Sequence, residues 1–309
     1  MALAEKYRLP LTSLSFARSV YERPVTEHDQ PDLLPQVMAD PQSRVMLLSE
    51  LGAALNGESL FLIPGPDYQA SGQEKFVYLG RDKQHLFVLA IVDSSVLDER
   101  TESSWTTLRD AFNVLDAAQA ELFVEAQAIA NWRRNEVFCP RCGSELRSST
   151  SGWVQRCVDN GHELFPRTDP AVIAAIVDSE DRLLLGANST FKSKMYSVLA
   201  GFVEAGESLE SAVRREIFEE SGVHVGDVAY RGSQPWPMPR SLMLGFTGEA
   251  LSTQLVPDGA EILDLRWFTR EQLGSELSAG TLQIPRGISI AHALIRNWYG
   301  EALPEAPSK

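Results

Sequence analysis

The sequence predicts an α+β protein in which two α/β regions flank a small cysteine-containing module. Its 309 residues exceed what one compact core usually needs, so we expect more than one domain. Strand-like and helical segments alternate on both sides of a short turn-rich stretch, which holds all three cysteines. We therefore expect an N-terminal α/β scaffold at 1–135, the cysteine module at 136–166 and a C-terminal domain at 167–309.

The composition, with 44% hydrophobic and 23% charged residues, is that of an ordinary globular protein. The N-terminus lacks the apolar core of a signal peptide, and the longest strongly apolar run, Ala171–Val177, is too short to span a bilayer. We therefore expect a cytoplasmic protein without membrane contact. The net charge of −14 argues against a long basic track for nucleic acid and suits hard divalent cations, although solubility alone explains it equally well.

Residues 1–135 carry several weak strand and helix signals. Glu74–Leu79 and His85–Val92 have the pattern of strands separated by a polar turn. Between Trp105 and Arg133, apolar residues recur near helical spacing, which predicts one or two helices. No recognisable chemistry lies there, so we interpret the region as a scaffold with a share in dimerisation.

The C-terminal region begins with a predicted β-hairpin, in which Ala171–Val177 and Leu183–Ala187 flank a polar turn. A glycine-containing loop then leads into a predicted helix, Ser208–Ser221, with Ser208 as its N-cap and Gly222 as its end. Two further strands and a closing helix are expected at Leu242–Ala250, Leu263–Phe268 and Ile288–Tyr299.

Three glutamates on the predicted helix are the most informative residues of the chain. Glu216, Glu219 and Glu220 are spaced i, i+3 and i+4, so a helix places their carboxylates on one side within a single turn. Such like charges destabilise an isolated helix, and a bound divalent cation would reverse that cost. Arg215 can pair with Glu207 or Glu219 and orient them. A solvated acidic helix face would explain the bare glutamate spacing as well.

The longer pattern is more specific. The string G-x5-E-x7-R-E-U-x-E-E-x-G-U, where U is aliphatic, runs from Gly201 to Val223 without a departure. It resembles the signature of the Nudix hydrolases, and the resemblance covers about residues 167–300. It implies an α/β/α sandwich that holds Mg²⁺ or Mn²⁺ against a pyrophosphate linked to a nucleoside. The implied metal-binding and catalytic groups are Arg215, Glu216, Glu219, Glu220, Glu261 and the Ala200 carbonyl.

A proline-rich segment, S-Q-P-W-P-M-P-R-S at 233–241, follows the string. Its three prolines exclude a central strand and give a stiff loop. Trp236 on that loop can form one wall of a base-stacking pocket, and Gln234 and Ser241 can supply hydrogen bonds. The residues alone fit a structural Pro/Trp turn as well. The segment is similar to SQPWPFPxS, which marks the NADH pyrophosphatase branch of the Nudix family, with Met238 where that pattern has Phe.

Members of that branch are dimers that cleave NAD(H) to nicotinamide mononucleotide and AMP, and some remove NAD caps from RNA. The resemblance therefore implies a homodimer with NAD(H) and related dinucleotides, and NAD-capped RNA, as substrates. The implied substrate contacts are Phe165, Phe202, Gln234, Pro235, Trp236, Pro237, Met238, Pro239, Arg240, Ser241, Ala291 and, most weakly, Arg109.

The three cysteines favour a metal site over a disulfide framework, because their number is odd and they are clustered. Cys139-Pro-Arg-Cys142-Gly is typical of one knuckle of a zinc ribbon, and Cys157 lies at a suitable range for the second. Asn160 stands where a fourth cysteine is expected. His162 can complete a Cys3His tetrahedron around one structural Zn²⁺ per chain. A degenerate ribbon that folds without metal is the alternative.

Three functions compete at this point. They are an NAD(H) pyrophosphatase, an enzyme that removes NAD caps from RNA by the same chemistry, and a non-catalytic nucleotide-sensing or adaptor module. The intact glutamate string disfavours the adaptor. The sequence does not distinguish NADH from NAD⁺ as substrate, nor Glu219 from Glu261 as general base.

Overall fold

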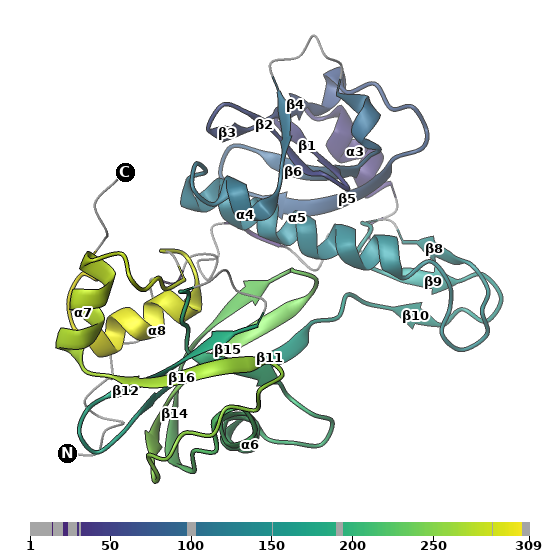
Figure 1. Ribbon diagram of the computed structural model, residues 1–309. Helices are drawn as coiled ribbons and strands as arrows, with labels where there is room; N and C mark the ends of the chain where they lie inside the picture. The colour runs from purple at the N-terminus through teal and green to yellow at the C-terminus, as the bar shows by residue number, and fades with distance from the viewer. Residues whose placement is uncertain are drawn as a thin grey trace. The chain divides into compact units, whose positions relative to one another are not determined.

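The computed structural model describes residues 14, 21–23, 30, 32–97, 103–149, 151–189, 194–285 and 287–304. The chain divides into two compact units (Figure 1). The C-terminal unit contains Asp169–Pro235 and the described residues from Ser241 onward, together with Leu14. The N-terminal unit contains the described residues from Tyr21 to Thr168 and also Trp236–Arg240. Within the described ranges, no helix is long and apolar enough to cross a membrane.

The C-terminal unit is built on a six-stranded mixed sheet. Its strands are β11 (Asp169–Val177), β12 (Leu183–Asn188), β13 (Leu199–Phe202), β14 (Val225–Trp236), β15 (Ser241–Ala250) and β16 (Ile262–Phe268). The strand order is β14-β15-β11-β12-β16, and β13 pairs with β11. Strand β11 runs parallel to β15 and antiparallel to β12 and β13.

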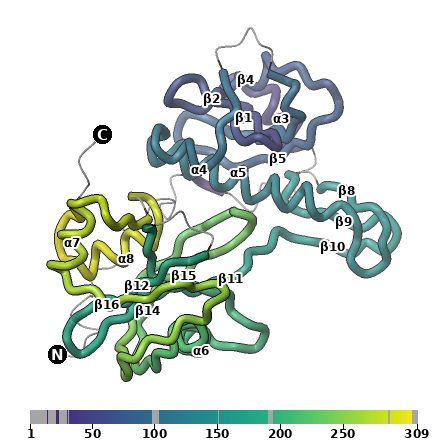
Figure 2. Tube along the Cα trace, in the orientation of Figure 1, coloured from purple at the N-terminus to yellow at the C-terminus, as the bar shows by residue number. Residues whose placement is uncertain are grey.

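Helices cover both faces of this sheet. They are α6 (Leu209–Ser221), α7 (Arg270–Ser278) and α8 (Ile290–Tyr299). On β11, Val172, Ala174 and Ile176 belong to the core cluster with α6, whereas Ile173, Ala175 and Val177 belong to the cluster with α7 and α8. This two-residue alternation is the pleat of a strand buried on both faces. The expected α/β/α sandwich is therefore confirmed (Figure 2).

Most of the predicted C-terminal elements are present. Strands β11 and β12 form the predicted hairpin. Helix α6 is capped by the Ser208 side chain, which accepts a hydrogen bond from the Ser211 N–H, and it ends at Gly222 with φ 71°. Strand β13 lies where we predicted a loop, and α7 was not predicted.

The prediction of a loop over the whole of 233–241 is wrong. Strand β14 continues through Ser233 to Trp236, and only Pro237–Arg240 connects it to β15. The strand tolerates Pro235 because β14 is the edge of the sheet, where a missing N–H breaks no ladder. The exclusion of a central strand is confirmed, because β14 lies at the edge of the sheet.

The N-terminal unit has its own seven-stranded sheet. Its strands are β1 (Ser43–Ser49), β2 (Gly52–Asn56), β3 (Ser59–Leu60), β4 (Leu62–Pro64), β5 (Lys75–Arg81), β6 (Leu86–Ile91) and β7 (Ser104–Thr106). Its helical segments are α3 (Leu33–Ala39), η1 (Gly65–Asp67), η2 (Ser94–Val96), α4 (Leu108–Ala111) and α5 (Ala117–Asn135). The two predicted strands are β5 and β6, which pair antiparallel, and the predicted helical region contains α4 and α5.

The two sheets share one topology. Strand β1 is antiparallel to β2 and β4 and parallel to β6, just as β11 is antiparallel to β12 and β13 and parallel to β15. Strand β2 pairs with β7 as β12 pairs with β16. Between β4 and β5, however, the chain forms only η1, whereas between β13 and β14 it forms α6. The N-terminal unit is therefore a copy of the same architecture without the glutamate helix.

The cysteine module is a small antiparallel sheet. It consists of β8 (Leu146–Ser148), β9 (Gln155–Cys157) and β10 (Glu163–Leu164), with β9 in the middle. It is grouped with the N-terminal unit, where the Arg133 guanidinium at the end of α5 donates to the Ser148 hydroxyl.

Candidate metal and substrate site

Helix α6 presents Glu216 to a glycine on the neighbouring strand. The apolar residues Ala212, Val213 and Ile217 are buried against the sheet, which fixes the rotation of the helix about its axis. Glu216 then lies over Gly201 of β13, where an added Cβ would come within 2.0 Å of the Glu216 carboxyl carbon. Gly201 therefore provides the space that the Glu216 carboxylate occupies.

Arg215 connects the loop before α6 to three glutamates. Its guanidinium donates to both carboxylate oxygens of Glu207 at 3.0 and 2.8 Å, and to the Phe202 carbonyl at 2.9 Å. It also lies 2.9 Å from a Glu216 oxygen and 3.1 Å from a Glu219 oxygen. Both partners suggested by the sequence, Glu207 and Glu219, are thus held by one guanidinium.

Glu220 is buried without full compensation. The residue is 6% exposed, and its Oε2 has no hydrogen-bond partner among the described residues. Burial, and then the nearby carboxylates of Glu261, Glu216 and Asp258, raise the pKa of Glu220 to about 8, against the lowering effect of the Ala200 backbone N–H. A carboxylate in this setting is stabilised by protonation or by a cation.

Glu261 approaches the same cluster from the start of β16. The preceding loop is organised by Asp258, whose carboxylate accepts backbone N–H groups from Ala260, Glu261 and Ile262 at 2.8–3.1 Å. The Asn188 amide donates to Glu261 Oε1 at 3.0 Å. Glu261 is among the carboxylates that raise the pKa of both Glu216 and Glu220, so these three predicted residues are close to one another.

Glu219 differs from its two neighbours. Its side chain is 57% exposed, against 15% for Glu216, and it lies at the rim of the cluster. The three glutamates thus share one turn of α6, but two are inside the cluster and one faces solvent.

The carboxylate cluster fits a hard divalent cation. The carboxylates of Glu216, Glu220 and Glu261 are near enough to influence one another, and the buried Glu220 Oε2 has no partner among the described residues, so a bound cation would offset the cost of burying this negative charge. Mg²⁺ and Mn²⁺ prefer such oxygen ligands.

The proline-rich segment is divided between the two units. In the C-terminal unit Gln234 is fully buried, donating to the Ile288 carbonyl at 2.7 Å and accepting from the Ile290 N–H at 2.8 Å, so its amide fixes the start of α8. In the N-terminal unit the Asn131 amide donates to the carbonyls of Pro237 and Pro239 at 3.0 and 2.7 Å.

Of the other predicted substrate residues of the N-terminal unit, Arg109 lies beside this loop. Arg109, Pro237 and Met238 together line a cavity of about 410 Å³. The Trp236 ring lies 6.3 Å from that of Phe112, and Arg240 lies 3.8 Å from a Glu136 oxygen. Phe165 is 46% exposed, in the same unit.

In the C-terminal unit, Phe202 is 57% exposed and available for stacking. Ala291 is 6% exposed and belongs to the core cluster beneath α8, and Ser241 is 9% exposed at the start of β15. The side chains of Ala291 and Ser241 are therefore buried and pack inside the C-terminal unit.

The cysteine module forms two matching knuckles. The Gly143 N–H donates to the Cys139 carbonyl at 2.8 Å, and the Gly161 N–H donates to the Cys157 carbonyl at 3.1 Å. Both glycines have positive φ, 77° and 70°, which the tight turns require. Asn160 thus occupies in the second knuckle the place that Cys142 occupies in the first.

The three thiols are placed to bind a metal ion, but the fourth ligand of a tetrahedral site is not a cysteine. Their sulfur atoms all lie within 4.8 Å of one another. The Asn160 amide nitrogen lies 3.0 Å from Cys142 Sγ, while its oxygen accepts the His162 backbone N–H at 2.8 Å. His162 Nδ1 lies 3.7 Å from Cys139 Sγ but is outside the group formed by the three sulfurs. Asn160, where a fourth cysteine was expected, is therefore a hydrogen-bond donor to sulfur, and the nitrogen available as a fourth ligand is that of His162.

Sequence reasoning missed four residues that organise these sites: Asn131, Asn188, Gly201 and Asp258. Gly201 and Asp258 had a usable signal, because one is a fixed glycine of the long string and the other precedes Glu261 by three residues. The two asparagines act across 106 and 73 residues of sequence, and nothing local marks them.

Comparisons with known proteins agree with this geometry. Residues 167–287 match the NUDIX domain, residues 35–132 the NADH pyrophosphatase-like rudimentary NUDIX domain, and residues 134–165 the NADH pyrophosphatase zinc ribbon domain. The second match accounts for the shared topology of the two units, and the third assigns a metal-binding class to the cysteine module.

Similar proteins include the NAD-capped RNA hydrolase NudC of Mycobacterium bovis (strain BCG / Pasteur 1173P2), 37% identical over 271 residues that cover 84% of each chain. The human NAD-capped RNA hydrolase NUDT12 is 41% identical over 196 residues, which cover 60% of this chain and 42% of that protein. A solved NUDIX hydrolase from Nitrosomonas europaea aligns with a TM-score of 0.40 and 20% identity, over 55% of this chain and 96% of that one. The chain belongs to the Nudix hydrolase family, in its NADH pyrophosphatase branch.

Proposed function

We propose that the protein hydrolyses the pyrophosphate of NAD(H), releasing nicotinamide mononucleotide and AMP. The observation that carries the chemistry is the buried Glu220, whose unpartnered oxygen lies among the carboxylates of Glu216 and Glu261. The matches to NADH pyrophosphatase-like segments and the proline-rich segment support the choice of dinucleotide.

Glu216, Glu219, Glu220, Glu261 and the Ala200 carbonyl would hold Mg²⁺ or Mn²⁺. A divalent cation there would neutralise pyrophosphate charge and lower the pKa of a bound water. Arg215 holds Glu216 and Glu219 in fixed orientations through its contacts at 2.9 and 3.1 Å. Glu219 and Glu261 are the carboxylates available to accept a proton from the attacking water.

The proposed substrate contacts follow the predictions. Phe202 offers an exposed ring for stacking a base. Three of the predicted contacts are buried: Gln234, Ser241 and Ala291. We propose that they hold β14, β15 and α8 in position. The remaining proposed contacts are Arg109, Phe165, Pro235, Trp236, Pro237, Met238, Pro239 and Arg240.

Removal of NAD caps from RNA is the second candidate, because relatives at 37% and 41% identity carry the name NAD-capped RNA hydrolase. The same carboxylates would act on the same bond.

Comparing products from NADH, NAD⁺, ADP-ribose and NAD-capped RNA, each with Mg²⁺ and with Mn²⁺, tests both candidates. We expect nicotinamide mononucleotide and AMP from NAD(H). With a net charge of −14, lengthening a capped RNA beyond a few nucleotides should add little affinity and give a shallow salt slope. Absence of NAD(H) cleavage would reject the main proposal, and affinity that climbs with RNA length would show a basic track.

We also propose that the cysteine module holds one structural Zn²⁺ per chain through Cys139, Cys142 and Cys157, with His162 as fourth ligand. Burial raises the pKa of the Cys139 thiol, but hydrogen bonds with His162 and with backbone N–H groups outweigh it and lower the pKa to about 6. A thiol in this state is ready to bind metal.

Elemental analysis of protein purified without chelator should find one zinc per chain, and Cys139→Ser should remove it. Asn160→Cys supplies a fourth thiolate and should make zinc harder to extract in a chelator competition. Asn113→Cys, which adds an exposed thiol elsewhere, is the matched control and should change nothing. A folded, active, zinc-free wild-type protein would instead support the degenerate ribbon.

The proposed assembly is a homodimer, as the resemblance implies, and light scattering of the purified protein measures it directly. The proposed location is the cytoplasm, whose reducing conditions suit the free thiols of Cys139, Cys142 and Cys157.

A further inference from the structure

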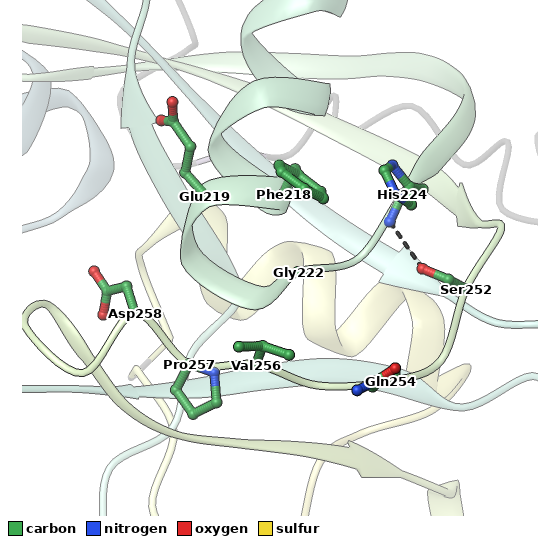
Figure 3. A pocket seen from close by; sticks show the side chains of 9 residues that line it. All are labelled: Phe218, Glu219, Gly222, His224, Ser252, Gln254, Val256, Pro257 and Asp258. Atoms are coloured by element: carbon green, nitrogen blue, oxygen red, sulfur yellow. Dashed lines mark hydrogen bonds between the residues drawn. The ribbon is translucent and has the colours of Figure 1, made fainter.

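A groove on the C-terminal unit runs alongside the end of α6 (Figure 3). Its volume is about 660 Å³, within the usual range for sites that hold small molecules. One wall is the end of α6 with the residues that follow it, and the other is the segment from Ser252 to Asp258. The lining residues are Phe218, Glu219, Gly222, His224, Ser252, Gln254, Val256, Pro257 and Asp258.

The two walls are tied together, so the groove is preformed. The Val256 N–H donates to the Ser221 carbonyl at 2.8 Å. The His224 N–H donates to the Ser252 hydroxyl at 3.0 Å. A ligand therefore need not order the segment that would contact it, which removes one cost of binding.

The groove contains a pair of stacked aromatic rings that the proposed chemistry does not use. The rings of Phe218 and His224 are stacked, with centroids 4.7 Å apart and an angle of 26° between their planes. Phe218 is nevertheless 48% exposed, although it lies within the helix that carries the metal-binding glutamates. Exposed aromatic rings in binding grooves are suited to stacking on planar ligands.

The other end of the groove is acidic. Glu219 and Asp258 line it on one side, while His224 and Ser252 lie on the opposite side (Figure 3). A free anion would be repelled at the acidic end unless a cation screened it. A ligand that joins a planar ring to a phosphate would match both ends at once, with its phosphate beside the divalent cation that the neighbouring carboxylates would hold.

We propose that this groove binds a nucleobase, which stacks on an outer face of the Phe218–His224 ring pair. Phe202 would serve the other ring of the dinucleotide. Ser252 and Gln254 supply polar groups for the base edge. The proposal rests on the proposed pyrophosphatase function. The base is either the second base of NAD(H) or the first RNA base beyond an NAD cap.

The test compares Phe218→Ala and His224→Ala with the wild type. Dissociation constants are measured by calorimetry with Ca²⁺ for NADH and for an NAD-capped RNA bearing two further nucleotides, alongside NADH hydrolysis with Mg²⁺. Tyr230→Ala removes a similarly exposed ring, 54% exposed and outside the groove, and is the matched control. Thermal melting establishes that each variant is folded.

We expect the two groove variants to bind about tenfold more weakly, on the scale of base stacking on aromatic residues. Weakened binding of both ligands identifies the base as part of the dinucleotide. Weakened binding of the capped RNA alone, with unchanged NADH hydrolysis, identifies it as an RNA base. Unchanged binding of both ligands by folded variants overturns the groove proposal, while NADH hydrolysis by the wild type tests the pyrophosphatase function separately.

Discussion

Glu220→Gln is expected to abolish turnover while making the metal-free protein more stable. The variant keeps the size of the side chain but removes a charge that a divalent cation would bind, so turnover should fall by roughly two orders of magnitude or more. The same charge is costly in the absence of metal, because the residue is 6% exposed among other carboxylates. With chelator at pH 8.5, the free energy of unfolding should rise by roughly 4 kcal/mol, because a one-unit difference in pKa between the folded and unfolded states is worth about 1.4 kcal/mol.

The gain in stability should depend on pH in a defined direction. In the folded protein the pKa of Glu220 is raised from 4.5 to about 8. Its contribution to wild-type stability is therefore complete below pH 4.5 and is lost as pH rises through about 8. Chemical denaturation with chelator should accordingly show the variant and the wild type converging at low pH and separating at high pH.

Two further variants on α6 test whether the gain in stability comes from the burial of Glu220. Glu219→Gln should reduce turnover strongly without stabilising the protein, because its side chain is 57% exposed. Glu210→Gln, exposed in the first turn, should change neither property. If Glu220→Gln kept near wild-type turnover at saturating Mg²⁺, the proposed role of Glu220 as a metal ligand would be rejected.

Gly201→Ala is expected to impair catalysis without impairing folding. The new Cβ would lie 2.0 Å from the Glu216 carboxyl carbon and 2.1 Å from one of its oxygens. The carboxylate is the flexible end of a side chain, so it can swing aside while α6 stays in place. Turnover should fall roughly 10- to 100-fold, the range for changes that disturb the orientation of metal ligands. The apparent Mg²⁺ requirement should rise, and the melting temperature should change little.

Gly287→Ala is the matched control, because a Cβ at that position meets nothing within 4 Å. It should leave the Mg²⁺ titration of activity unchanged. If Gly201→Ala behaved like this control, Glu216 would not need its observed position. A large drop in melting temperature would instead show that the helix, rather than the carboxylate, had moved.

The parts of the fold that the sequence predicted are those with strong local periodicity. Strands β11 and β12 are apolar runs around a polar turn, and α6 has an apolar face between a serine cap and a glycine end. Strand β13 is only four residues long and contains Gly201, so its pairing with β11 decides its conformation. Strand β14 carries Pro235 near its end, and only its place at the sheet edge makes this proline acceptable.

The candidate site, too, was only partly predictable from the sequence. Spacing on α6 was enough to group three carboxylates, but it could not show that Glu220 is buried and Glu219 exposed, because the packing of the whole sheet sets that difference. For Gln234 the residue type suggested a ligand contact. The structure instead uses both ends of its amide on backbone groups of the segment that starts α8.

The anchoring of the proline loop bears on how the protein can be dissected. Residues Trp236–Arg240 belong to the N-terminal unit, and Asn131 of α5 grips two of their carbonyls. A truncated chain that begins at Asp169 would retain every glutamate of the cluster. It would lose Asn131, however, and with it the two hydrogen bonds that hold this loop. We therefore expect this truncated chain to lose the observed conformation of the loop, and circular dichroism and NADH hydrolysis of the truncated chain test that. The N-terminal unit has no glutamate helix of its own, and what it contributes to this loop is the pair of hydrogen bonds from Asn131.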